Sequence, residues 1–107
     1  MTPPQVQDPN VEPAGYTPPT SAGEILDRYA RGERYFVGTR LSNESLDGAI
    51  LVDVNLQRST LRQVGFVGAN LSGADFRHCT FSTVDYGRAD LRRTRFDFCT
   101  FEDADFG

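Results

Sequence analysis

The sequence lacks the segments that would direct it into or across a membrane. It has no apolar run of about 18 residues, and its first residues carry neither the basic start nor the apolar stretch of a secretory signal. Tryptophan is absent, and two cysteines in 107 residues are too few for a disulfide scaffold. We therefore expect one domain in the cytoplasm, with no membrane partner.

The sequence also lacks a strong excess of either positive or negative charge. Fifteen acidic residues against eleven basic ones give a formal net charge of -4, and neither sign collects in a block. Proteins that bind nucleic acid usually carry a basic stripe, so we expect no nucleic-acid partner.

Proline is confined to the first part of the chain. All six prolines lie in residues 1–20, where almost nothing apolar is available for burial. Such a segment cannot offset its own ordering entropy, so residues 1–20 are predicted to form a disordered Pro-rich tail. A proline-rich docking ligand is the alternative, which the lack of flanking basic residues disfavours.

A short capping helix is predicted within residues 21–33. Ser21 and Glu24 match the S-x-x-E capping box, and Gly32 offers a left-handed stop. The apolar residues between them share one face at helical spacing: Ile25, Leu26, Tyr29 and Ala30. So short a helix does not persist alone in water, so it should plug the N-terminal end of the segment formed by residues 34–107.

From Phe36 onward an apolar residue recurs at every fifth position without a break over fifteen units, and the residue two before it is usually small. A period of five fits neither a helix nor a strand, so the chain must turn a corner once per repeat. With both of these residues pointing inward, the predicted central ladder from the second coil onward is Leu51, Leu56, Leu61, Phe66, Leu71, Phe76, Phe81, Tyr86, Leu91, Phe96, Phe101 and Phe106.

The choice of residues recurs at twenty. Leu51, Leu71 and Leu91 each follow an Ala by two positions, and Cys79 and Cys99 are twenty apart. Four units should therefore close one coil, which predicts an all-β solenoid over residues 34–107, a parallel β-helix of about 3.5 coils.

The pattern resembles the pentapeptide-repeat family, whose consensus is Ala, then Asp or Asn, then Leu or Phe, then two variable residues. Ala74-Asp75-Phe76 and Ala89-Asp90-Leu91 are close matches. The resemblance implies a right-handed quadrilateral β-helix, and the helix before it is similar to the lead-in of many bacterial members. Arg34 and Glu44 depart from the pattern at inward positions that should be small, so the first coil is expected to be irregular.

The C-terminal coil is expected to be open, because the sequence has no helix, proline or charged lid after Phe106. Uncovered strand edges invite pairing, so we predict a homodimer through this coil, with Phe96, Phe101 and Phe106 at the interface. The acidic rim argues the other way, because like charges would meet there: Asp97, Glu102, Asp103 and Asp105.

No constellation of side chains indicates catalysis. His78, the single histidine, is expected at an outward corner, without a partner oriented for acid–base chemistry. Cys79 and Cys99 suit a reduced ladder better than a metal site, with a strained disulfide as the alternative. The arginines near the fourth face should form a salt-bridged surface and not an anion site: Arg88, Arg92, Arg93 and Arg95. We predict no enzyme, no metal, no cofactor and no small-molecule substrate.

Flat faces without a deep concavity favour a non-catalytic scaffold or protein-interaction module, with a protein partner that the sequence does not name. The alternative is a DNA mimic, since the resemblance includes family members that bind DNA gyrase and protect it from quinolones. Those proteins are strongly acidic rods, whereas the predicted coil holds ten acidic residues against eight arginines.

Overall fold

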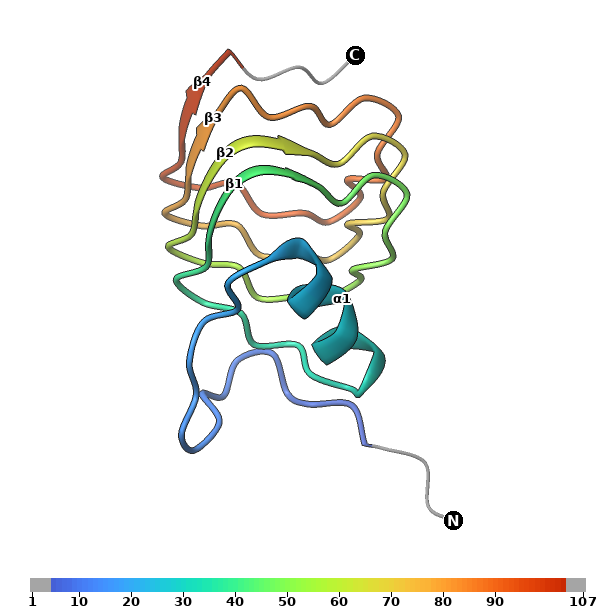
Figure 1. Cartoon of the computed structure of the whole chain (residues 1–107), viewed down its shortest axis with the longest axis vertical. Helices are drawn as coiled ribbons and strands as arrows, with labels where there is room; N and C mark the ends of the chain where they lie inside the picture. Colours follow the sequence, from blue (N-terminus) through green and yellow to red (C-terminus); the bar gives the residue numbers. More distant parts are fainter. Residues whose placement is uncertain (1–4, 104–107) are drawn as a thin grey trace.

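The computed structural model describes residues 5–103. The chain winds into a stack of coils with one helix, α1 (Ala22–Ala30), lying across the N-terminal end of the stack (Figure 1). One wall of the stack is a parallel sheet in the order β1-β2-β3-β4, formed by β1 (Arg40–Ser45), β2 (Thr60–Gly65), β3 (Thr80–Ser82) and β4 (Thr100–Glu102). None of the helical structure in residues 5–103 is long and apolar enough to cross a membrane.

Each strand pairs with the strand twenty residues later. Leu41 pairs with Leu61, which pairs with Phe81, which pairs with Phe101. The isolated bridges on the other sides of the stack have the same offset, as in Ile50 with Asn70 and Gly65 with Asp85, so twenty residues make one turn of a parallel β-helix solenoid. Identical positions of successive coils therefore lie above one another.

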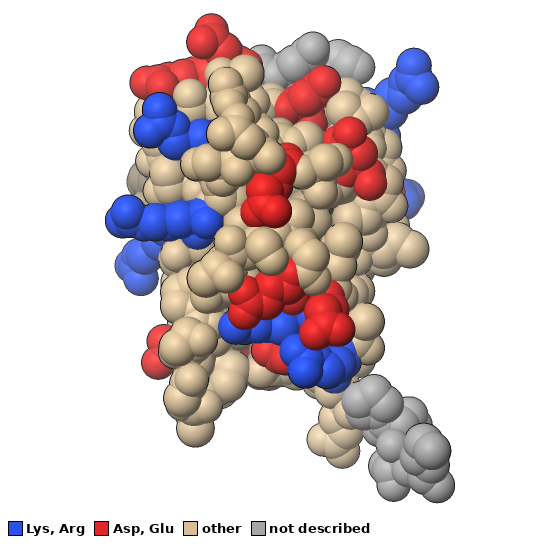
Figure 2. Space-filling view, viewed as in Figure 1, with Lys and Arg blue, Asp and Glu red and all other residues tan. Residues whose placement is uncertain are grey.

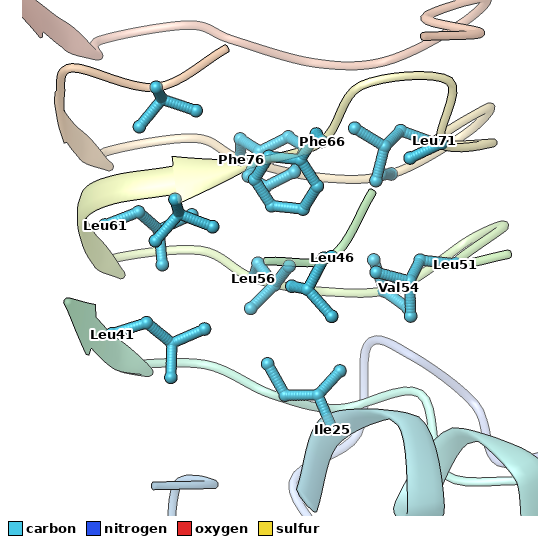
Figure 3. Packing of buried hydrophobic residues seen from close by; sticks show 14 of the residues in the cluster. Ile25, Leu41, Leu46, Leu51, Val54, Leu56, Leu61, Phe66, Leu71 and Phe76 are labelled. Atoms are coloured by element: carbon cyan, nitrogen blue, oxygen red, sulfur yellow. The ribbon is translucent and has the colours of Figure 1, made fainter. Parts of the chain in front are cut away.

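The inward side chains form one continuous core (Figure 3). The central residues from Leu51 to Tyr86 are at most 1% exposed. In the last described coil Leu91 and Phe96 are half-buried, Phe101 is 40% exposed, and Phe106 lies outside the described residues. Aromatic residues twenty apart stack on one another, with ring centroids 5.3 Å apart for Phe66 and Tyr86, 5.4 Å for Phe76 and Phe96, and 4.9 Å for Phe81 and Phe101.

Small inward residues connect the coils by side-chain hydrogen bonds. The Cys79 thiol donates to the Leu56 carbonyl at 2.9 Å, and the Cys99 thiol donates to the Phe76 carbonyl at 2.8 Å. Both cysteines are free thiols, so the disulfide alternative does not hold. Burial raises the pKa of the Cys79 thiol to about 12, which makes it a packing residue and not a nucleophile.

A thiol-labelling experiment should separate the two cysteines. Because only the thiolate reacts, we expect Cys79 in a Cys99→Ser variant to react at least about a hundredfold more slowly in the folded protein than after unfolding. Cys99, half-buried in the last described coil, should react first in the parent. A chromogenic disulfide reagent measures the rate of thiol exchange, and mass spectrometry of the products shows which cysteine has reacted. Equal rates for Cys79 in the folded and unfolded chain would show that the buried thiol ladder is wrong.

Every corner of the coil is a residue in the left-handed region, two positions after the central residue. Fourteen consecutive units from Gly38 to Asp103 have a positive φ there, and ten of the fourteen residues are not glycine. The least tolerant of these are Thr83 at φ 54° and Phe98 at φ 62°, because β-branched and bulky side chains clash with the backbone in this region. Hydrogen bonds between coils hold the corners, as between the His78 amide and the Asp97 carbonyl at 3.0 Å.

Helix α1 is capped at both ends by its own sequence. The Ser21 hydroxyl accepts the Glu24 amide at 3.0 Å, as predicted for a capping box. The Glu24 carboxylate does not return to the Ser21 amide, however, and instead accepts the amide and hydroxyl of Thr20. At the other end Gly32 has φ +98° and donates to Tyr29, which completes a left-handed stop.

The two charged residues that break the repeat hold the two ends of this helix. The Glu44 carboxylate accepts the Ala22 amide at 3.0 and 3.1 Å, at the positive N-terminal end. The Arg34 guanidinium donates to the Tyr29 carbonyl at 2.9 Å, at the negative C-terminal end, and lies 3.6 Å from the centroid of the Tyr29 ring. The first coil is therefore the attachment site of the helix.

Residues 5–20, which we name the N-terminal strap, differ from the predicted disordered tail. They lie along the first coil and bond to its edge. The Gln7 side-chain oxygen accepts the amides of both Arg34 and Tyr35 at 2.9 Å, and the Tyr16 hydroxyl donates to a carbonyl of the same coil at 2.8 Å. The prediction considered only how little apolar surface this segment can bury. It did not consider that the backbone polar groups at the edge of the first coil need hydrogen-bond partners, which the segment supplies.

Candidate interaction surface

The outer side of the β1–β4 wall is the most regular surface of the molecule. The strand register stacks the outward side chains of successive coils into columns, and the corners on either side add one column each. We call this surface the wall face. From one corner to the other its columns are Arg58-His78-Phe98, Arg40-Thr60-Thr80-Thr100, Ser42-Arg62-Ser82-Glu102 and Asn43-Gln63-Thr83-Asp103.

An exposed aromatic stack borders the wall face. The rings of His78 and Phe98 lie parallel within 10°, with centroids 4.9 Å apart. Phe98 is 80% exposed, more than any other large apolar side chain among residues 5–103. The structure thus places His78 at an outward corner, as the sequence predicted, but on an aromatic neighbour that the prediction did not consider.

The middle of the wall face is shallow and polar. A hollow of about 290 Å³ is lined by hydroxyl, amide and guanidinium groups from Ser42, Asn43, Arg62, Gln63, Ser82 and Thr83. These groups can donate and accept hydrogen bonds, but no carboxylate, thiol or imidazole lines the hollow. No general base lies among the lining residues to activate the hydroxyl groups, so what the hollow offers is hydrogen bonding.

Charge is divided between the two ends of the wall face. Arg40, Arg58 and Arg62 belong to the coils near α1, whereas Glu102 and Asp103 belong to the last described coil. None of these five side chains forms an ion pair within residues 5–103. Figure 2, in the view of Figure 1, shows basic side chains projecting from the left edge of the molecule and acidic ones above them at the upper left.

The arginine group predicted to be salt-bridged is only partly so. Arg92 forms a two-pronged pair with Asp90, whose shortest contact is 2.7 Å, and this pair lowers the pKa of Asp90 to about 2. Arg77 and Asp75 form the same arrangement three repeats earlier, at 2.8 Å. Acidic and basic side chains are both present on the visible surface (Figure 2), so the charge distribution gives the DNA-mimic alternative no support.

A second hollow, of about 420 Å³, lies between the N-terminal strap and the coil. Its polar lining is largely occupied by partners in the protein. The Tyr29 hydroxyl donates to the Val52 carbonyl at 3.1 Å, the Asn55 amide donates to the Pro9 carbonyl at 2.7 Å, and Asp75 holds its arginine. This hollow lies where the strap crosses the coil, and sequence reasoning did not find it.

The predicted interface at the end of the coil is only partly within the described residues. Phe101 presents apolar surface there and Phe96 is half-buried, while Phe106 lies outside. Sequence reasoning missed Phe98, which is twice as exposed as Phe101. Its signal was an aromatic residue at a variable, outward position where the other units have polar residues or glycine.

Comparison with known families agrees with the coil. Pentapeptide repeats match the chain in eight copies, over residues 55–82 and 69–107. The chain belongs to the pentapeptide-repeat family. Among curated proteins, none matches this pentapeptide-repeat chain. Within residues 5–103 no three side chains of His, Cys, Asp or Glu gather closely enough to hold a metal ion.

Proposed function

We propose that this pentapeptide-repeat protein is a non-catalytic scaffold, a protein-interaction module whose binding surface is the wall face. For the coil that carries it, we propose the right-handed, four-sided β-helix of about 3.5 coils that the family resemblance implies. The partner is a protein, because the surface is flat and wide and offers apolar, charged and hydrogen-bonding groups together.

The exposure of Phe98 carries this proposal. A large aromatic ring that is 80% exposed is unfavourable in water, and its backbone at φ 62° adds conformational strain. Core packing does not offset either cost, because the Phe98 side chain points away from the core. Aromatic residues are among the commonest anchors of protein interfaces, so we infer that the exposed ring binds a partner.

The rigidity of the wall face supports the same function. Its side chains stand on paired strands, and its corners are fixed by hydrogen bonds between coils, such as Thr83 amide to Glu102 carbonyl at 2.7 Å. A surface that is ordered before it binds loses little conformational entropy on binding. The four columns are therefore suited to contact a partner without rearrangement.

A photoreactive phenylalanine analogue at position 80 tests this proposal in cells that make the protein naturally. Thr80 is exposed at the centre of the wall face, and Asn70, on another side of the coil, is the matched control position. We expect protein adducts from position 80 and not from position 70, and we expect Phe98→Ala to reduce them at least about fivefold. Equal labelling at the two positions, or labelling indifferent to Phe98→Ala, would contradict the proposal.

The end-to-end homodimer through the C-terminal coil stays a prediction. The exposed part of Phe101 is the described surface that it would use, together with the half-buried Phe96. Its acidic rim, with Glu102 and Asp103, would bring like charges together.

A further inference from the structure

We propose that the wall face binds a second copy of the same chain, packed face to face about a two-fold axis that runs along β3. This inference rests on the proposed function of the wall face as a binding surface, and it names the partner. The observations that carry it are the order of the side chains in each column and the absence of ion pairs for the charged ones within residues 5–103.

A two-fold axis along β3 brings the coil before β3 opposite the coil after it. In such a contact a residue one coil before β3 meets the residue of the same column one coil after β3 in the other copy. By symmetry this pairing occurs twice. Arg62 then faces Glu102, and Thr60 faces Thr100, because these residues are the register partners one coil below and one coil above β3. The β3 residues themselves, Thr80 among them, face their own counterparts.

The charges of the wall face are complementary only in this orientation. One end presents Arg58 and Arg62 and the other presents Glu102 and Asp103, and none of these side chains is neutralised by a partner in the described part of the chain. Two copies that pack with the same end up would bring the basic end of one against the basic end of the other. Two copies related by the axis along β3 bring the basic end of each against the acidic end of the other, which fixes both the orientation and the register.

The border column and the threonine column fit the same arrangement. Phe98 is opposite Arg58 of the other copy, whose methylene stem can cover the exposed ring while its guanidinium stays at the rim. The threonine column is uniform and short in side chain, so it allows two flat faces to approach closely over Thr60, Thr80 and Thr100. The two-fold contact therefore covers the apolar group that the isolated chain leaves in water.

The contact is small, so the dimer should be weak. The three strands that overlap in this orientation, β2 to β4, lie about 4.8 Å apart, and one side about five residues wide then gives roughly 240 Å² of flat area per copy. Stable interfaces bury about 800 Å² per partner, and smaller ones belong to transient complexes. We expect dissociation constants in the high micromolar range, with association weakened by salt, because the contact depends on exposed charges.

Sedimentation velocity with charge-swapped variants tests the two-fold dimer. The parent should dimerise between about 20 µM and about 1 mM. Arg62→Glu and Glu102→Arg should each raise the dissociation constant at least about tenfold, since each variant places like charges opposite each other. An equimolar mixture of the two variants should dimerise like the parent, because the new carboxylate at position 62 faces the new guanidinium at position 102. Arg88→Glu, the same change of charge at a corner of another side, should have no effect.

Three outcomes would overturn the inference: a parent that stays monomeric at about 1 mM, a dimer that ignores both swaps, and a mixture of the two variants that fails to associate. A dimer that ignores both swaps uses another surface, including the C-terminal coil. Recovery in the mixture also shows that both variants are folded. If the parent is monomeric but position 80 cross-links to a different protein in a Phe98-dependent way, the second copy is rejected while the wall face remains the binding surface.

Discussion

Leu71→Asp is expected to unfold the coil at room temperature. Leu71 is fully buried in the middle of a column that continues with Leu51 in the coil before and Leu91 in the coil after. The change removes about 1.5–3 kcal/mol of burial and adds several kcal/mol for a carboxylate without a partner. Their sum approaches the roughly 5–15 kcal/mol by which domains of this size are stable.

Thermal melts followed by far-ultraviolet circular dichroism measure this effect, with Asn70→Asp as the matched control. Asn70 precedes Leu71 and lies on the outside of the same side of the coil, where its side-chain oxygen accepts the Ser72 amide at 3.1 Å. A carboxylate keeps this bond, so the control should change stability by less than about 1 kcal/mol. A cooperative melt of Leu71→Asp within about 5 °C of the parent would show that the central ladder is not the core.

The coil and its plug could be predicted from the sequence because their signals are repeated. A buried residue at every fifth position is seen many times over, and the recurrence of Leu51, Leu71 and Leu91 with Ala two before each sets the length of the turn. Helix α1 carried its own start and stop signals in Ser21 and Gly32. Each of these predictions depends on local geometry or on periodicity, and both are contained in one chain.

The strap and the corners could not be predicted, for different physical reasons. Gln7 replaces a backbone carbonyl for the amides of Arg34 and Tyr35, and such a long-range side-chain bond has no sequence pattern. Left-handed corners are usually recognised by glycine, but here they hold Thr83 and Phe98 among others, because hydrogen bonds between coils impose the conformation. The exposed ring at position 98, which matters most for the proposed function, was hidden in a position that the repeat leaves variable.

The two ends of the described coil differ in how their polar groups are satisfied. At the N-terminal end α1, the strap and the charges of Glu44 and Arg34 occupy the helix termini and the first-coil edge. A protected edge prevents uncontrolled strand pairing, which otherwise leads solenoids to aggregate. With this end closed, we expect binding to use a side or the far end of the stack, and the wall face is the side that carries the exposed ring of Phe98.

Ile25→Ala should destabilise the protein by about 2–4 kcal/mol, because Ile25 is the large, fully buried side chain with which α1 closes the core. Its side chain is fully buried and points up into the first coil, beneath the level of Leu41 and Leu46 (Figure 3). The core of a solenoid is supported only by neighbouring coils, so a cavity under the first coil weakens the whole stack from that end. Leu26→Ala is the matched control, since Leu26 is the next residue of the same helix and is 41% exposed.

Urea unfolding measures both variants, and hydrogen exchange locates the effect. The control should lose less than about 1 kcal/mol, although both changes introduce the same better helix former. In Ile25→Ala the amide of Asn55, which donates to the Arg34 carbonyl at 2.8 Å, should exchange faster relative to the amide of Thr100, which donates to the Cys79 carbonyl at 3.0 Å. Equal losses for the two variants would mean that α1 lies on the coil without plugging it.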